Sequence, residues 1–139
     1  MTGVEKVMID SINYYVSLWV GYSESDEKLL DYISVDYSEE DSEDYYYSQF
    51  MKDFGIDDVD EDDMERIFLD NETDSIKCFL SGCSYEDKVI PEFEKIFVSG
   101  EKFNSGLLLY DHKYNSNITA NEDKYCRLKF VGTVKIKIK

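Results

Sequence analysis

The segment CRLKFVGTVKIKIK at residues 126–139 alternates apolar side chains with basic or polar ones along almost its whole length. Successive side chains of a β-strand point to opposite faces, so the segment predicts a strand with one apolar face and one wet, basic face. A sheet with one solvated face is typical of antiparallel pairing. Gly132 interrupts the apolar series and predicts a bulge or bend.

Two further segments predict strands of the same sheet. Asn13–Gly21 carries bulky side chains on both of its faces, which is typical of a central strand. Gly106–Tyr110 is a short apolar run that predicts another strand, and a polar loop follows over His112–Glu122. Met64–Leu69 fits a helix and a strand equally well, and periodicity leaves both interpretations open.

Four segments place apolar residues at helical spacing. They are Ser25–Val35; the aromatic stripe Tyr46, Phe50 and Phe54 before Gly55; Ile76, Phe79 and Leu80 before Gly82; and Phe93, Ile96 and Phe97 before Gly100. Asp74 or Ser75 can cap the third segment, and Pro91 suits the first turn of the fourth. The order of elements predicts an α+β fold, a mainly antiparallel sheet with about four helices packed on it. We expect a single domain over residues 1–139, with 1–12 as a loose N-terminal segment.

The charge of the chain is concentrated in one stretch, Asp31–Asp74. This stretch holds 18 acidic residues against two bases, Lys52 and Arg66, whereas acids and bases are equal in number elsewhere. The net charge of −16 therefore belongs to this stretch. Such a surface repels nucleic acids and anionic membranes, and it speeds the encounter with a basic protein. We expect a basic protein partner, with no nucleic-acid or membrane ligand; the plainer alternative is that the acids only keep the protein soluble.

The sequence lacks the residue sets of familiar catalytic and metal sites. It holds one histidine, His112, and no G-x-S-x-G segment, so we expect that the protein is not an enzyme. Three scattered cysteines without a C-x-x-C pair do not form a zinc site. Their odd number and the lack of a secretion signal predict reduced thiols in a cytoplasmic protein. We find no glycine loop for phosphate and expect no cofactor.

One acidic segment has part of the spacing of a calcium site. Asp58, Asp60 and Asp62 occupy the first, third and fifth positions of an EF-hand loop. The sixth position, where glycine is needed, is Asp63, and the twelfth, where glutamate is needed, is Leu69. Because two required positions fail, we expect no dedicated metal site. A divalent-cation buffer at this segment stays an alternative hypothesis.

Short motifs spread through the chain carry a family resemblance. They are Trp19-Val-Gly21 with Ser23-Glu24, Asp31-Tyr32, Asp36-Tyr37, the segment Ser48–Ile56, Asp60-Glu-Asp62 with Glu65, Ser84-Tyr85, Leu108-Leu-Tyr110 with Tyr114, and Phe130-Val-Gly132. In this order they resemble the immunity protein 22 family of bacterial polymorphic toxin systems, from about Val16 to Val134, and Ser48–Glu65 is the most specific part. The chain departs from the family pattern at Asp57-Asp58-Val59, where aromatic residues are expected, and at Asp111, where asparagine is expected.

The resemblance implies a non-enzymatic antidote. Proteins of that family are small and cytoplasmic, and they bind and block the C-terminal domain of a toxin encoded beside them; such toxins often cut nucleic acids. We therefore expect a basic toxin domain, a nuclease, bound through the acidic surface. The residues expected to contact it are Asp57, Asp58, Asp60, Asp62, Asp63, Tyr45, Glu40 and Asp41.

Other interpretations of the same residues stay open. Each acid taken alone is also explained as a solvated side chain, and Asp60, Asp62 and Glu65 can serve the fold instead of a partner. A second functional hypothesis is an acidic nucleic-acid mimic that inhibits DNA- or RNA-binding proteins more generally. That mimic would bind many basic proteins, and salt would weaken each complex steeply.

Overall fold

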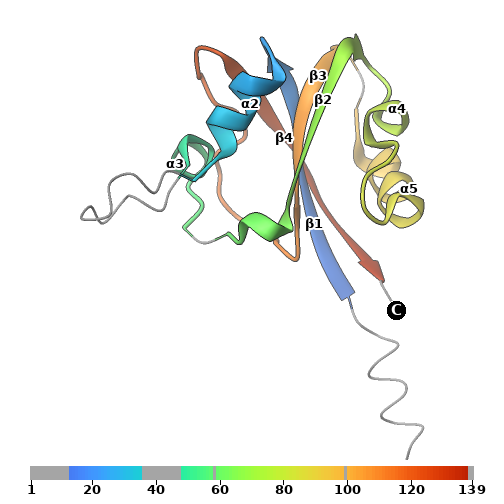
Figure 1. Ribbon diagram of the computed structural model, residues 1–139. Helices are drawn as coiled ribbons and strands as arrows, with labels where there is room; N and C mark the ends of the chain where they lie inside the picture. The colour runs from blue at the N-terminus through green and yellow to red at the C-terminus, as the bar shows by residue number, and fades with distance from the viewer. Residues whose placement is uncertain (1–12, 36–47, 58, 99, 138–139) are drawn as a thin grey trace, which may run out of the picture.

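Four strands form one antiparallel sheet in the computed structural model, which describes residues 13–35, 48–57, 59–98 and 100–137 (Figure 1). The strands are β1 (Asn13–Ser23), β2 (Met64–Thr73), β3 (Phe103–Tyr110) and β4 (Cys126–Lys137). Their order across the sheet is β2-β3-β1-β4, and each neighbouring pair runs antiparallel. The expected loose segment 1–12 and Tyr46 of the aromatic stripe lie outside the described residues.

The two inner strands, β1 and β3, bury side chains on both faces of the sheet. Leu18 and Trp19 are neighbours in β1, point to opposite faces and are both fully buried. Every residue of β3 is buried as well. This is the pattern of strands that are covered on both sides. The prediction of a central strand at Asn13–Gly21 is confirmed, and the strand continues to Ser23.

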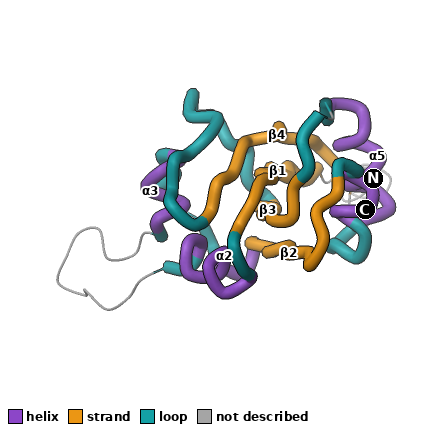
Figure 2. Tube along the Cα trace, turned by 90° about the horizontal axis from the view of Figure 1, so that it is seen from above, coloured by secondary structure: helices purple, strands orange, loops and turns teal. Residues whose placement is uncertain are grey.

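Helices cover both faces of the sheet, as Figure 2 shows from above. α2 (Asp26–Ile33) and α3 (Gln49–Phe54) lie on one face, whereas α4 (Ile76–Leu80) and α5 (Glu86–Ile96) lie on the other. The core under α2 and α3, the Trp19 core, includes Trp19, Leu29, Phe50, Phe54, Leu107 and Leu128. The core under α4 and α5, the Leu108 core, includes Leu18, Phe79, Leu80, Val89, Phe93 and Leu108. The predicted α+β class is confirmed.

A bulge in β4 shows that the prediction of one continuous apolar face is wrong. Leu18 pairs with Gly132 whereas Trp19 pairs with Phe130, so Val131 is the extra residue. One extra residue reverses the alternation of side chains, so the strand changes face at this point and its basic residues are divided between the two faces. The bend predicted at Gly132 is confirmed. Cys126 and Leu128, before the bulge, pack in the Trp19 core, and Val134 and Ile136, after it, pack in the Leu108 core.

Local sequence signals set three of the helix starts in the described chain. The side-chain oxygens of Ser25, Ser48 and Ser75 each accept the backbone N–H of the residue three positions further on. These bonds satisfy donors that a helix start leaves without an internal partner. Gly55 adopts a left-handed φ of 68° and ends α3, as predicted.

The start of α5 differs from the prediction. The helix begins at Glu86, so Pro91 lies inside it rather than in its first turn. The Glu86 carboxylate accepts the N–H of Gly82 at 2.7 Å, and Tyr85 has a left-handed φ of 57°, so the turn after α4 starts the helix early. Ile96, which was expected to point inward, is 44% exposed because it falls at the last turn of the helix.

Pairing with β3 decides the ambiguous segment Met64–Leu69, which forms the first part of strand β2. Met64 pairs with Leu109 and Phe68 pairs with Ser105. The edge of β3 supplies hydrogen-bonding partners that the pattern of a six-residue segment does not reveal.

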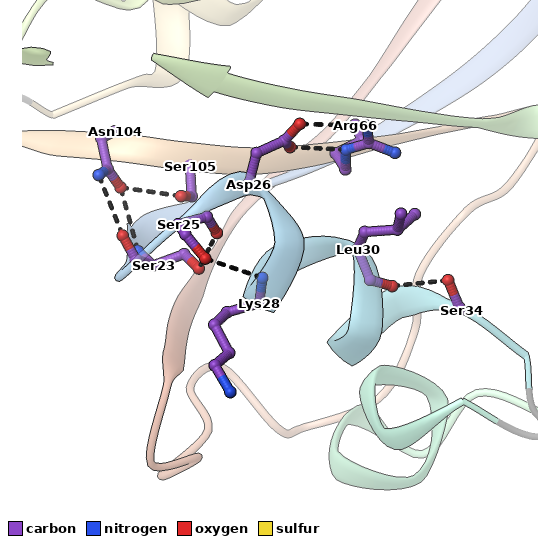
Figure 3. A network of polar contacts seen from close by, with 9 residues as sticks. All are labelled: Ser23, Ser25, Asp26, Lys28, Leu30, Ser34, Arg66, Asn104 and Ser105. Carbon is purple, nitrogen blue, oxygen red and sulfur yellow. Dashed lines mark hydrogen bonds and ion pairs between the residues drawn. The ribbon is translucent and has the colours of Figure 1, made fainter. Parts of the chain in front are cut away.

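Polar contacts around Ser23 fix the start of α2 on the sheet (Figure 3). The Ser23 N–H donates to the Asn104 side chain at 3.0 Å, and the Asn104 amide donates to the Ser23 carbonyl at 3.1 Å. Asp26, in the first turn of α2, pairs with Arg66 of β2 at 2.8 Å. One of the two bases in the Asp31–Asp74 stretch therefore binds an acid outside that stretch.

We predict that Gly106→Ala destabilises the protein. A Cβ at this position would lie 2.5 Å from the Trp19 carbonyl oxygen and 2.7 Å from the Phe79 ring. Overpacking of this kind costs about 1–3 kcal/mol, which urea denaturation would measure. The control is Gly100→Ala, where the added Cβ meets no described residue within 4 Å apart from its chain neighbours. Its effect should stay within about 0.5 kcal/mol, and equal losses in the two variants would contradict the prediction.

Candidate functional site

The described acidic residues among those predicted to contact a partner lie in the connection between α3 and β2. The structure describes Asp57, Asp60, Asp62 and Asp63, and it contains a short 3-10 helix, η1 (Glu61–Asp63), at the end of the connection. Asp57, Asp60 and Asp62 are exposed, and Asp63 is half-buried. Four predicted residues lie outside the described part of the chain: Asp58, Tyr45, Glu40 and Asp41.

Asp60 organises the η1 turn. Its side chain accepts the Asp62 N–H at 2.9 Å, and its carbonyl accepts the Asp63 N–H at the same distance. An aspartate in this position satisfies the free N–H groups at a helix start. Asp60 therefore has a structural role, as one of the alternative interpretations of the sequence allowed, while its side chain stays at the surface.

The register of β2 on β3 brings a further acid to this turn. Because Met64 pairs with Leu109, Asp63 lies beside the end of β3, where Tyr110 and Asp111 follow. Asp111 has a left-handed φ of 57°, a conformation that aspartate tolerates better than most residues. We call the surface formed by Asp60, Asp62, Asp63 and Asp111 the acidic end.

An open cavity of about 340 Å³ lies within the acidic end. It is lined by Val59, Asp60, Asp63, Tyr110, Asp111 and His112. This volume is at the lower limit of the range for ligand clefts, roughly 300–1,000 Å³, so the cavity suits a single side chain better than a polymer strand. A cationic side chain fits its carboxylate lining.

The carboxylates of the acidic end repel one another. The pKa of Asp63 is raised above its ordinary value, first by partial burial and then by the charges of Asp60, Asp111 and Asp62. The three ion pairs found among the described residues, Arg66–Asp26, Lys95–Glu92 and Lys129–Glu101, do not include any of these four acids. An approaching positive group would relieve the repulsion.

Glu65 holds the acidic end to the turn between α4 and α5. Its carboxylate accepts the Tyr110 hydroxyl at 2.6 Å and the Ser84 N–H at 3.0 Å. Burial, and then the hydrogen bond to Glu65, raise the pKa of Tyr110, so the phenol keeps the proton that it donates. Glu65 thus serves the fold, which was one of the two interpretations left open by the sequence.

Three tyrosines gather beside the acidic end. The ring centroids of Tyr14, Tyr85 and Tyr110 lie 6.2–6.4 Å apart, and we call this group the tyrosine cluster. Tyr85 is 45% exposed. Sequence reasoning predicted none of these residues, nor Asp111, as part of a site. The Tyr110–Asp111 pair at a predicted strand end was visible, but its place beside Asp63 requires the strand order.

Other candidate chemistry finds little support in the described residues. They include no group of three or more His, Cys, Asp and Glu side chains placed to hold one metal ion. The cysteines are free thiols, of which Cys83 and Cys126 are buried and Cys78 is exposed. Burial raises the pKa of Cys83 to about 11 and that of Cys126 to about 12, which keeps both as unreactive thiols. Among the described segments, no helix has the length and apolar character needed to cross a membrane.

Comparison with known protein families assigns the chain to one family. The fold is a four-stranded sheet with an acidic end, and the family model named immunity protein 22 matches residues 16–136. The chain belongs to the immunity protein 22 family, which confirms the resemblance seen in the sequence. Membership supports a toxin-neutralising role, and immunity proteins are generally not enzymes. Comparison with curated proteins gave no match, and comparison with solved structures gave none either.

We predict that Glu65→Ala weakens the fold, because the substitution leaves the Ser84 N–H without its acceptor and removes the nearer of the two acceptors of the Tyr110 hydroxyl, the other being the Ser84 carbonyl at 3.1 Å. The expected loss is about 1–3 kcal/mol in the free energy of unfolding, measured by urea denaturation. Tyr110→Phe removes the hydroxyl but leaves the hydrogen bond from the Ser84 N–H to Glu65, so it should cost less, about 0.5–1.5 kcal/mol. Glu94→Ala, at an exposed position of α5, is the control. A Glu65→Ala loss no greater than the control's would show that the carboxylate does not hold these elements together.

We predict that Asp63→Asn stabilises the free protein at pH 7. The pKa of Asp63 is raised in the folded state, so that state binds the proton more readily than the unfolded chain does. Stability therefore falls as the pH rises from the pKa of Asp63 in the unfolded chain to its higher pKa in the folded state. Above the folded-state pKa, the ionised carboxylate opposes folding. The variant removes this charge, and its urea midpoint should rise. Asp57→Asn, at an exposed position, should leave the midpoint unchanged; a midpoint lowered by Asp63→Asn would refute the argument.

Proposed function

We propose that this chain neutralises a basic nuclease toxin domain, and that the acidic end of the sheet contacts it. The observation that carries the proposal is the convergence of Asp63 and Asp111 on one open cavity, with Asp60 beside them. Family membership supports a toxin as the partner. The charge of the cavity lining supports a basic contact surface on that toxin.

Electrostatic complementarity supports a nuclease. An enzyme that cuts nucleic acid must present a basic groove to the phosphate backbone. Carboxylates held on a folded surface can occupy or cover such a groove in place of the phosphates. The net charge of −16 would also steer the two proteins together and raise the rate of association.

The proposed contact set keeps the eight residues predicted from the sequence and adds Asp111. Asp57, Asp62 and Asp63 are the best described members for a test because no structural hydrogen bond of their side chains is found among the described residues. Asp60 also caps η1, so its replacement would change the fold and the contact together. Tyr45 stays in the set as an aromatic anchor of the kind that dominates protein interfaces.

The remaining parts of the proposal follow from the same partner. We place the protein in the cytoplasm, bound to the C-terminal domain of the toxin encoded beside it. Neither nucleic acid nor membrane is a ligand, and no cofactor or enzyme activity takes part. A general nucleic-acid mimic is the competing hypothesis, and it differs by binding basic proteins without regard to their identity.

We predict that the chain restores growth to cells that express the adjacent toxin domain and that the two proteins copurify. The triple variant Asp57→Asn, Asp62→Asn and Asp63→Asn should raise the Kd about tenfold or more, because charged contacts at short range are lost. Isothermal titration calorimetry would measure the Kd.

A matched triple variant separates contact from net charge. Asp70→Asn, Glu94→Gln and Glu122→Gln remove the same charge from exposed positions elsewhere and should change the Kd little. Absence of rescue and of copurification would reject this toxin as the partner. Equal binding to an unrelated basic nuclease at moderate salt would favour the general mimic instead.

A further inference from the structure

The tyrosine cluster presents an exposed aromatic surface in a fixed position. Tyr14, Tyr85 and Tyr110 come from β1, the turn before α5, and β3, and each ring contacts the other two. Tyr85 has a φ of 57°, which is unusual for a bulky residue and persists only where the surroundings hold it. Tyr85 is 45% exposed, and the surrounding residues hold it in a fixed position.

Two other tyrosines in the described part of the chain, Tyr15 and Tyr125, carry a lysine over their rings. Lys28 lies 4.2 Å from the centre of the Tyr125 ring, and Lys113 lies 5.3 Å from that of Tyr15. Over the part of the chain that the structure describes, no lysine or arginine is found above a ring of the tyrosine cluster. The cluster offers an aromatic surface that the chain does not itself cover with a cation.

The tyrosine cluster and the cavity share one residue, and the carboxylates of the cavity act electrostatically on the cluster. Tyr110 belongs to the cluster and also lines the cavity, together with Asp63 and Asp111. Burial, and then the charges of Asp63 and Asp111, raise the pKa of Tyr14, which places these carboxylates within electrostatic range of the cluster. Figure 1 shows the start of β1, the end of β3 and the connection before β2 at the same end of the sheet.

We propose that this cavity and the adjoining tyrosine cluster form a receptor for one arginine side chain of the toxin. The guanidinium would bind Asp63 and Asp111 and lie against a ring of the cluster. Arginine suits the site better than lysine because its flat group stacks on aromatic rings and binds carboxylates with two hydrogen bonds. The inference rests on the proposed function, to which it adds the chemistry of the contact.

The first experiment tests the receptor without the toxin. N-acetylarginine amide, N-acetyllysine amide and uncharged N-acetylglutamine amide are titrated into the isotope-labelled protein, and backbone amide shifts are followed by NMR. We expect saturable shifts at Asp63, Tyr85 and Asp111, with arginine binding more tightly than lysine and glutamine not binding. Equal effects of all three compounds, or none at these positions, would overturn the proposal. Calcium chloride is titrated separately, and saturable shifts of the same amides would overturn it in favour of a metal site.

The second experiment uses the complex with the adjacent toxin domain. Asp111→Asn keeps a residue that tolerates the left-handed conformation, and we expect it to raise the Kd about tenfold. Tyr85→Leu removes the ring and should raise the Kd about threefold to tenfold, whereas Tyr85→Phe keeps the ring and should change it little. The matched controls, Asp70→Asn and Tyr22→Leu, replace exposed residues away from the cavity.

The outcomes separate this inference from the proposed function. If the unaltered protein binds the toxin and both Asp111→Asn and Tyr85→Leu bind it as tightly, the arginine receptor is refuted although the proposed function stands. If the unaltered protein does not bind the toxin, the proposed partner fails, and the arginine titration alone decides whether the cation receptor exists. Urea midpoints of all variants show whether each protein is folded. If Tyr85→Leu does not fold, Asp111→Asn still tests the receptor.

Discussion

Coverage of the sheet on both faces is the constraint on which the rest of this structure depends. β1 and β3 lie inside the sheet, with α2 and α3 on one side and α4 and α5 on the other. Successive residues of these strands must then be apolar or internally hydrogen-bonded, because no face remains for water. Charged residues are left with the edge strands, the helix surfaces and the strand ends.

This constraint explains where the candidate site lies. Asp63 precedes an edge strand and Asp111 follows an inner one, so both carboxylates sit at strand ends that the antiparallel register places together. The hydrogen bonds of Glu65 and Tyr110 with the Ser84 backbone then tie that end of the sheet to the turn that carries Tyr85. The acidic end and the tyrosine cluster are therefore parts of one framework, and the surface proposed to meet the toxin is positioned by the same contacts that close the Leu108 core.

Several features could be predicted because they depend on local chemistry. The Ser75 cap, the glycine that ends α3 and the bulky residues on both faces of β1 are properties of short segments, and the structure confirms them. The errors arose where distant contacts prevailed over local preference. The bulge at Val131 divides the apolar series of β4 between two cores, and the turn at Tyr85 starts α5 before Pro91. Asp57, Asp60, Asp62 and Asp63 could be selected from charge alone, whereas Asp111 and Tyr85 could not.

The sequence by itself determined the fold class, the family motifs and the confinement of the net charge to Asp31–Asp74, since composition, periodicity and caps are written in neighbouring residues. Only the tertiary structure decided that Met64–Leu69 is a strand, because pairing with β3 supplies hydrogen bonds that no local pattern contains. It also decided which acids share a surface. Asp63 and Asp111 are far apart along the chain, and only the register of β2 on β3 brings their charges within range of each other.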